Sequence, residues 1–255
     1  MSRIVIKVGS NVLTRSDGTL DVTRVSSLVD QIAGLRSAGY EVILVTSGAV
    51  ACGRSILGAE PELDSVEQRQ VFSSVGQVRL MDLYHTLFKN YDIIVGQVLT
   101  MKEDFTPGPF FNNQKGCMEA MLKSGVLPIV NENDTVSITE LMFTDNDELS
   151  GLVSTMMDVE TLVILSNIDG VYDGDPSLPG SQIIRTITGA NDRSDCICEA
   201  KSSRGRGGMQ SKYHVARSVA QSGIRVLIAN GKRENILCRI ILEADPDTPY
   251  TEFTK

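Results

Sequence analysis

Two lysines stand in settings that suit the binding of phosphate. Lys7 lies near the end of the apolar run Ile4–Val8 and is followed closely by Gly9. A lysine in an apolar strand is costly unless it meets an anion or a carboxylate, and glycine lets backbone N–H groups approach a ligand. An edge-strand lysine that points to water is the alternative. Because of the glycine, we favour an anion site.

The second lysine, Lys212, follows the glycine-rich segment Gly205–Ser211, which leads into a predicted helix. Glycines expose backbone donors, and a helix N-terminus carries a partial positive charge. Lys212 lies about one turn inside this helix, where it can reach a phosphate. A flexible surface loop with a solvated lysine stays open as the alternative for this segment on its own.

Ser47 follows a second apolar run, Val42–Thr46, and precedes a helical stretch. Its hydroxyl suits an N-cap, and the same position suits an anion at a helix N-terminus. The two interpretations are compatible.

Two clusters of carboxylates and amides also follow predicted strands or begin helices. The segment 131–134 reads Asn-Glu-Asn-Asp after the apolar Leu127–Val130, and the segment 145–147 reads Asp-Asn-Asp at the start of a helix. Asx turns and N-caps explain part of this pattern, but a cap needs only one such residue. Carboxylates can bind an ammonium group, order lysines or hold Mg²⁺.

Two common nucleotide motifs are absent from the sequence. Gly231-Lys232 is followed by Arg233, so there is no P-loop, and the dinucleotide pattern that starts at Gly205 fails at Gln210. P-loop NTPases and dinucleotide-dependent oxidoreductases are therefore disfavoured. No nucleophile–base pair is evident. Lysines, glycine loops and carboxylates without such a pair suit phosphoryl transfer, which depends on positioning and charge neutralisation.

Short apolar runs rich in Val and Ile alternate with helical patterns along the chain. This alternation predicts an α/β fold with helices on both faces of a mainly parallel sheet, and ligands bind beyond the carboxyl ends of such strands. The predicted strands are Ile4–Val8, Val42–Thr46, Ile93–Leu99, Val126–Val130, Leu162–Leu165 and Arg225–Ala229. The predicted helices are Val22–Ala38, Ser65–Lys89, Gln114–Lys123, Asn146–Met157, Met209–Ser222 and Asn235–Glu243. The stretch Thr135–Thr144 alternates like a hairpin.

Composition sets the class of protein. The chain has 255 residues, 42% of them hydrophobic, and a net charge of −8. We expect one domain over residues 1–255, located in the cytoplasm, because no secretory signal or membrane-length apolar stretch occurs. The acidic balance argues against nucleic acid as a partner. Five cysteines and two histidines form no plausible zinc pattern, so we expect reduced thiols and no protein-held metal.

Seven segments together resemble the amino-acid kinase family, over the range from Lys7 to about Gly231. They are IKVGS (6–10), VTSGAVACG (45–53), SSVGQVRLM (73–81), IVNENDTV (129–136), FTDNDELS (143–150), SNIDGVYDGDP (166–176) and GRGGMQSK (205–212). The likeness implies a three-layer αβα sandwich. The VTSGAVA, VGQ and NEND segments resemble the members that phosphorylate the side-chain carboxylate of L-glutamate with ATP and Mg²⁺, the first step of proline biosynthesis.

The resemblance assigns roles to residues. Lys7 and Lys212 are expected to stabilise the phosphoryl group in transfer, and Asp147 to orient them. Glutamate is expected to bind Ser47, Asp134 and Asn146. ATP is expected to bind Lys7, Ser166, Asn167, Arg206, Gly207, Gly208, Met209, Gln210, Ser211 and Lys212. Arg206, Asn167 and Thr144 depart from the family's usual Thr, Asp and Gly.

The resemblance also implies partners. These are proline as a feedback inhibitor, a glutamyl phosphate reductase that consumes the product, and further copies of the chain in a homo-oligomer. Many members carry a C-terminal domain resembling an RNA-binding module, and we expect this chain to be a short form without it. Two rival functions stay open: a kinase for aspartate or an N-acylated glutamate, and a ligand-binding regulator without turnover. Asp134 suits a free ammonium, and the set Lys7, Asp147 and Lys212 suits turnover.

Overall fold

A computed structural model describes residues 2–58, 63–136, 143, 145–178, 180–191 and 208–255. The predicted hairpin over Thr135–Thr144 lies mostly outside these residues, as do Arg206 and Gly207. In the part of the chain that is described, no helix combines the length and the apolar character needed to cross a membrane.

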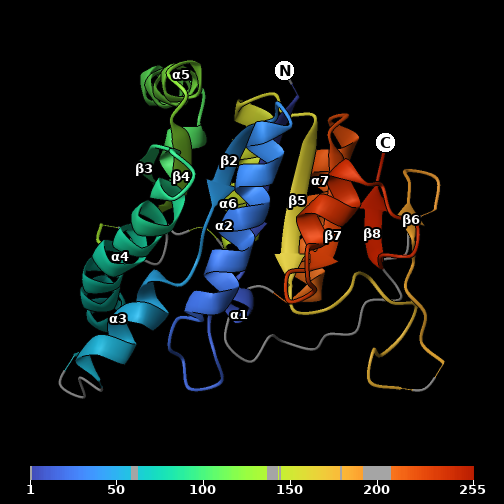
Figure 1. The fold of residues 1–255 in the computed structure, drawn as a ribbon, viewed down its shortest axis with the longest axis horizontal. Helices are drawn as coiled ribbons and strands as arrows, with labels where there is room; N and C mark the ends of the chain where they lie inside the picture. The colour runs from blue at the N-terminus through green and yellow to red at the C-terminus, as the bar shows by residue number, and fades with distance from the viewer. Residues whose placement is uncertain (1, 59–62, 137–142, 144, 179, 192–207) are drawn as a thin grey trace.

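One mainly parallel sheet forms the centre of the molecule (Figure 1). Within the described residues its order is β3-β4-β2-β1-β5-β7-β8-β6, and β8 is antiparallel to β7. The strands are β1 (Arg3–Val8), β2 (Glu41–Val45), β3 (Val95–Thr100), β4 (Leu127–Glu132), β5 (Thr161–Ser166), β6 (Thr186–Ile187), β7 (Arg225–Asn230) and β8 (Tyr250–Phe253). All six predicted strands are present, with ends shifted by at most two residues.

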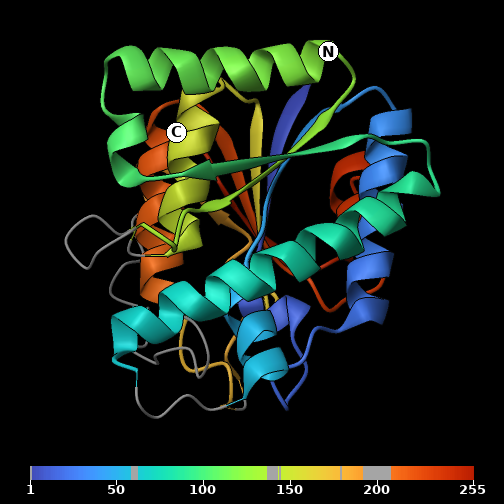
Figure 2. The same cartoon turned by 90° about the vertical axis from the view of Figure 1, so that its left-hand side faces the viewer.

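Helices cover both faces of the sheet. They are α1 (Ser10–Leu13), α2 (Val22–Ser37), α3 (Ala49–Leu57), α4 (Ser65–Lys89), α5 (Pro109–Lys123), α6 (Asn146–Met156) and α7 (Met209–Gln221), with the short segments η1 (Lys102–Phe105) and η4 (Cys238–Leu242). One apolar core joins the sheet to α2, α4 and η4, and a second joins it to α6 and α7. Figure 2 shows α2 on one side of the sheet and α6 and α7 on the other. The predicted αβα sandwich is confirmed.

Two predicted helices differ from the observed ones. α5 begins at Pro109, five residues earlier than the predicted Gln114, because proline is well suited to the first position of a helix. The predicted helix Asn235–Glu243 is instead a short π-helical segment over Cys238–Leu242.

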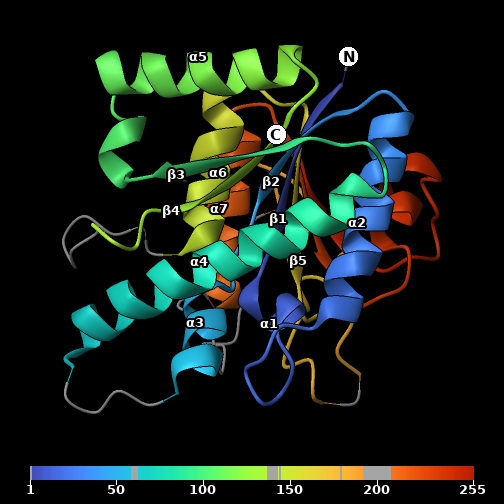
Figure 3. The ribbon, with the colours of Figure 1, turned by 60° about the vertical axis from the view of Figure 1, so that its left-hand side comes forward.

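Helices α3 and α4 pack directly against each other (Figure 3). A Cβ on Gly53 would lie 1.8 Å from the carbonyl oxygen of Phe72, and a Cβ on Gly76 would lie 1.8 Å from that of Ala49. Any larger residue at either position would force the helices apart. The glycines of the VACG and VGQ segments therefore set this crossing, which brings the N-terminal half of α4 over the end of β4.

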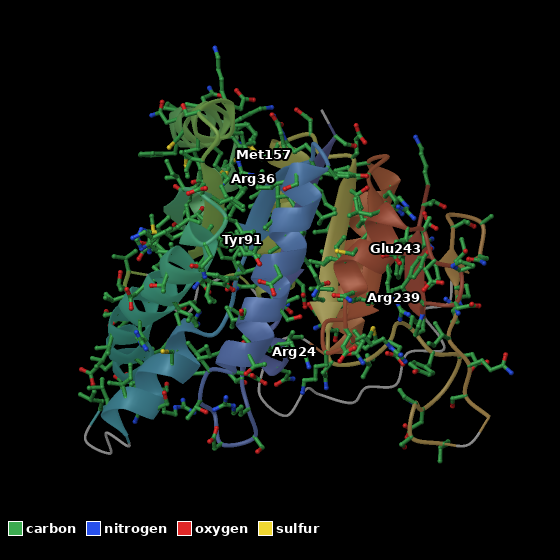
Figure 4. The ribbon with its side chains drawn as sticks, in the orientation of Figure 1. Arg24, Arg36, Tyr91, Met157, Arg239 and Glu243 are labelled. Atoms are coloured by element: carbon green, nitrogen blue, oxygen red, sulfur yellow. The ribbon has the colours of Figure 1, made fainter. Side chains whose placement is uncertain are left out.

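The opposite end of the molecule is held by arginines. Arg36 donates a hydrogen bond from Nη2 to the carbonyl oxygen of Gly125 at 2.7 Å, and Arg3 donates from Nη1 to that of Met157 at 2.8 Å. Arg36 and Met157 lie near the amino ends of the strands (Figure 4). α1 and α3 lie beyond the carboxyl ends, which is where the sequence predicts ligand binding (Figure 1).

Candidate active site

A pocket of about 730 Å³ opens at the carboxyl ends of the strands. Its walls come from the β1–α1 connection, α3, α4, the end of β4, the start of α6, the end of β5, and α7. Eight predicted site residues line it: Lys7, Ser47, Asp134, Asn146, Asp147, Ser166, Asn167 and Lys212.

Lys7, Asp147 and Lys212 form one buried cluster, called the basic cluster below. Lys7 Nζ lies 2.5 Å from Asp147 Oδ1, and Lys212 Nζ lies 2.9 Å from Asp147 Oδ2. Their exposed fractions are 4%, 1% and 8% for Lys7, Asp147 and Lys212. Burial alone raises the pKa of Asp147, but the two ammonium groups outweigh it and hold that pKa below its ordinary value. The cluster thus carries two positive charges and one negative charge.

Asp145, and not Asp147, caps the N-terminus of α6, so the carboxylate of Asp147 is available to the basic cluster. Asp145 Oδ1 accepts hydrogen bonds from the backbone N–H groups of Asp147 and Glu148, at 2.9 and 3.0 Å. Its Oδ2 accepts one from the Ser211 hydroxyl at 2.5 Å. One aspartate therefore joins the first turns of α6 and α7, and fixes the relative positions of Asp147 and Lys212.

Ser47 does not cap α3, so the N-cap interpretation is wrong. The N-cap is Gly48, whose φ of 99° turns the chain in a way that side-chain-bearing residues rarely adopt. The Ser47 hydroxyl instead accepts a hydrogen bond from Asn146 Nδ2 at 3.0 Å. Two residues predicted to bind the same substrate are thus in contact.

Asn146 is held by a network of amides. Its Nδ2 also contacts the carbonyl oxygen of Thr46 at 2.6 Å and Asn131 Oδ1 at 3.0 Å. Asn131 Nδ2 in turn donates to Gln77 Oε1 on α4 at 3.0 Å. The glutamine of the VGQ segment therefore fixes the orientation of Asn131, and through it that of Asn146.

Arg69, Glu132 and Asp134 form a second cluster, called the acidic cluster below, in which both carboxylates are buried and Arg69 is half-buried. Arg69 Nε donates to Asp134 Oδ1 at 2.6 Å, and Nη2 donates to Glu132 Oε2 at 2.5 Å; Nη2 also pairs with Asp134 Oδ1. Glu132 Oε1 accepts from the backbone N–H of Phe143 at 3.3 Å. Burial raises the pKa of both carboxyls, and Arg69 opposes the rise without cancelling it.

Sequence reasoning missed Arg69, although a signal was present. Arg69 lies on α4 at helical spacing from the buried Phe72, Ser73 and Gly76, so it continues the face of the helix that turns inward. An arginine on an inward face needs a buried anion.

The described residues among those predicted to bind ATP lie at the ends of β1 and β5 and at the start of α7. Ser166 is buried at the end of β5, and the exposed Asn167 follows it. Gly208 is the N-cap of α7. As a glycine it has no side chain to accept hydrogen bonds from the N–H groups in the first turn of this helix. Met209, Gln210 and Ser211 form the start of α7, next to Lys212.

The described residues do not suit a protein-held metal ion. No group of three or more histidine, cysteine, aspartate or glutamate side chains in the described ranges comes close enough together to hold one. Both oxygens of Asp147 face ammonium groups, and both oxygens of Asp145 accept hydrogen bonds.

The sequence comparison identifies the family. The profile of the "Amino acid kinase family" matches residues 2–230. This chain belongs to that family. The resemblance seen in the sequence motifs is therefore confirmed.

Several curated members of the family are similar over nearly the whole chain. The glutamate 5-kinase of Bacteroides thetaiotaomicron is 59% identical over 252 residues, which are 99% of this chain and 70% of that protein. The glutamate 5-kinase of Chlorobaculum tepidum is 48% identical over 92% of this chain and 65% of its own length. Glutamate 5-kinase 2 of Bacillus subtilis is 38% identical over 98% and 68%. The chain thus spans about two thirds of the length of these relatives.

Solved structures support the fold. UMP kinase from Ureaplasma parvum gives a TM-score of 0.68 at 18% identity, covering 100% of this chain and 99% of its own. Carbamate kinase from Giardia lamblia bound to AMP-PNP gives 0.70 at 16% identity, covering 100% and 98%. At these identities the likeness shows the αβα architecture of amino-acid kinases and nothing finer.

Proposed function

We propose that this chain is a glutamate 5-kinase, which transfers the terminal phosphoryl group of ATP to the side-chain carboxylate of L-glutamate. The product is L-glutamyl 5-phosphate, and the reaction is the first step of proline biosynthesis. The observation that carries the proposal is one pocket that contains two buried charged clusters of opposite net charge. Relatives named glutamate 5-kinase, up to 59% identical, support it.

The basic cluster suits phosphoryl transfer. Two ammonium groups with one carboxylate leave a net positive charge, which favours a triphosphate and the charge that spreads over the phosphoryl oxygens in the transition state. Because its pKa is lowered, Asp147 stays ionised and holds both lysines in place. We therefore assign Lys7 and Lys212 to charge stabilisation, and Asp147 to their positioning.

No general base is required in this reaction. A glutamate side chain has an unperturbed pKa of about 4.3, so the attacking carboxylate is already ionised at neutral pH. A pocket built from lysines, amides and carboxylates is therefore sufficient for this acceptor. A hydroxyl acceptor would need a group to take its proton.

The acidic cluster and the amides suit the amino acid. Asp134 lines the pocket and can accept a hydrogen bond from the substrate ammonium, while Ser47 and Asn146 offer polar contacts between the two clusters. Glutamate carries its positive charge and its reacting carboxylate at opposite ends, which matches the order of the clusters. An N-acylated glutamate lacks the ammonium and would leave Oδ2 of Asp134 without that partner.

ATP would place its phosphates near Lys7, Lys212, Gly9 and the first turn of α7. The carbamate kinase of the same fold was solved with AMP-PNP, an ATP analogue, which supports a nucleotide as the phosphoryl donor. Mg²⁺ would enter bound to the phosphate oxygens, since the described protein residues offer it no ligand cluster. Roles for Ser166, Asn167 and the segment 206–211 in binding ATP remain predictions.

Proline is proposed to compete with glutamate. It carries an ammonium that Asp134 can bind but has no side-chain carboxylate to react. Initial rates at several proline and glutamate concentrations test this, and absence of inhibition at millimolar proline contradicts it. A glutamyl phosphate reductase that consumes the product, a homo-oligomer, a single domain and a cytoplasmic location stay predictions from the sequence.

An ADP-release assay against a panel of acids tests the proposed function. The panel contains L-glutamate, L-aspartate, N-acetyl-L-glutamate and glutarate, with hydroxylamine added to trap an acyl phosphate as its hydroxamate. We expect ADP release with L-glutamate in step with γ-glutamyl hydroxamate. A preference for another acid, or ADP release without hydroxamate, contradicts the proposal.

A further inference from the structure

We infer that Arg69 is a positioning residue of the amino-acid subsite: it clamps Glu132 and one oxygen of Asp134, and presents the other oxygen of Asp134 to the substrate ammonium. The inference rests on the proposed function, because it assigns the ammonium to Asp134. It concerns Arg69 on α4, which lies outside the seven segments that carry the family resemblance.

The contact geometry separates the two oxygens of Asp134. Both contacts from Arg69, through Nε and Nη2, go to Oδ1. Oδ2 accepts no hydrogen bond from the part of the chain that the structure describes, and Asp134 lines the pocket. Glu132 differs, because its Oε2 accepts from Arg69 and its Oε1 accepts from the backbone N–H of Phe143. Glu132 is thus fully committed to structure, while Asp134 keeps one oxygen for a ligand.

The charge balance requires a cation at this position. Asp134 is 7% exposed and Glu132 is 6% exposed, and two buried carboxylates this close repel each other. Burial raises the pKa of both, and the Arg69 guanidinium opposes this rise. Without Arg69, Asp134 would take up a proton more readily, and a neutral carboxyl holds an ammonium poorly.

The closeness of α3 and α4 makes the clamp possible. Gly53 and Gly76 let the two helices touch backbone to backbone, so Arg69 reaches the end of β4 from the inward face of α4. The other charged side chains that line the same pocket are Lys7, Asp17, Arg54, Asp145, Asp147 and Lys212. Lys7 and Lys212 both pair with Asp147, and Arg54 lies over the Phe72 ring at 5.5 Å.

Steady-state kinetics of Arg69→Met test the inference. At pH 7 the KM for glutamate should rise roughly tenfold or more, with kcat and the KM for ATP nearly unchanged. As the pH is lowered, the KM for glutamate should begin to rise at a higher pH in Arg69→Met than in the wild type, because the pKa of Asp134 moves up. Arg79→Met is the matched control: Arg79 is on the same helix, and its pair with Asp82 is 60% and 58% exposed. It should match the wild type.

A double-mutant cycle with Asp134→Asn separates positioning from a general effect on the fold. In that background Arg69→Met should change the KM for glutamate by less than about threefold, since the two changes act on one contact. Arg69→Lys keeps the charge but loses the fork that reaches both carboxylates, so it should restore the pH profile with an intermediate KM. This variant also keeps the test decisive if Arg69→Met fails to fold.

A measurement without turnover distinguishes this inference from the proposed function. The carboxyl carbon of Asp134, followed by ¹³C NMR, should titrate at a higher pH in Arg69→Met than in the wild type, whatever the substrate. Inactivity of the wild type on glutamate would remove the proposed function and leave this shift intact. A fall or no change in the glutamate KM of Arg69→Met, or equal effects in both backgrounds of the cycle, would overturn the inference.

Discussion

The two charged clusters of the pocket have inverted compositions. The basic cluster places one carboxylate, Asp147, between two lysines, and the acidic cluster places one arginine between two carboxylates. Both are buried, yet the pKa of Asp147 is lowered while those of Glu132 and Asp134 are raised. Burial acts in the same direction on all three carboxyls, so the number of neighbouring cations decides the outcome.

This inversion divides the pocket by function. The basic cluster is short of negative charge and suits phosphate, whereas the acidic cluster is short of positive charge and suits an ammonium. Each cluster is incomplete in charge until its ligand arrives. The comparison therefore predicts different responses to the same kind of substitution at the two ends.

The largest effect on stability is expected from Asp147→Asn. Both lysines would stay buried with no carboxylate between them, which costs about 3–5 kcal/mol of the free energy of unfolding. Because the folded pKa of Asp147 is lowered, its contribution is complete above the pKa of an unfolded aspartate, about 3.9, and is lost as the pH falls through the folded value. Urea unfolding at several pH values measures this. A loss below about 1 kcal/mol at pH 7 would show that the lysines find other partners.

The largest effect on catalysis is expected from Lys7→Met and Lys212→Met. Each removes one preorganised cation from the developing charge and should lower kcat by roughly 10²–10³-fold. Lys102→Met is the control, since Lys102 pairs with Glu148, the residue after Asp147, and is 46% exposed. Its kcat should stay near that of the wild type. Near-normal turnover in either pocket variant would break the assignment of the basic cluster.

A smaller, selective effect is expected from Asp134→Asn. Loss of a charge-assisted contact with the ammonium should weaken glutamate binding by roughly 1.5–3 kcal/mol while leaving the KM for ATP nearly unchanged. Kinetics with each substrate varied in turn provide the measurement. Equal weakening for glutamate and ATP would mean that Asp134 has a structural role.

The smallest effect is expected from Glu132→Gln. The amide oxygen can still accept from Arg69, while the long 3.3 Å bond from the Phe143 N–H is lost. The repulsion between two carboxylates is relieved at the same time, so the free energy of unfolding should change by less than about 1 kcal/mol at pH 7. The folded pKa of Glu132 is raised, so its charge opposes folding above that pKa, and the opposition fades as the pH falls through it. Any stabilisation by Gln should therefore shrink at acidic pH. A loss comparable to that of Asp147→Asn would end the distinction between the clusters.

The basic cluster could be predicted from the sequence and the acidic cluster only in part. Lys7 and Lys212 follow local signals, a lysine in an apolar strand and a lysine after glycines, and parallel strands bring their ends together. Asp134 was expected to meet an ammonium, and the structure adds that Arg69 already contacts it. That contact depends on how closely α3 and α4 cross, which is a tertiary property that no local pattern encodes.

The same limit explains the remaining differences in the fold. β6 has two residues and β8 has four, so neither has a long apolar run from which it could be predicted. β8 is also antiparallel to β7, which the pattern of a mainly parallel sheet does not predict. Ser47 followed the pattern of an N-cap, but the left-handed turn at Gly48 displaced the start of α3 by one residue. Local sequence patterns therefore identified the longer helices and strands, whereas tertiary packing determined the residues at which they begin and end.

The preference for glutamate over glutarate tests the division of the pocket most directly. Glutarate keeps both carboxylates and lacks only the ammonium, so the ratio of the two kcat/KM values measures how strongly the acidic cluster recognises that group. We expect a large ratio in the wild type and a ratio roughly 10-fold or more smaller in Asp134→Asn, while Lys212→Met lowers both kcat/KM values and leaves the ratio nearly unchanged. A ratio that survives Asp134→Asn, or that collapses in Lys212→Met, would contradict the account.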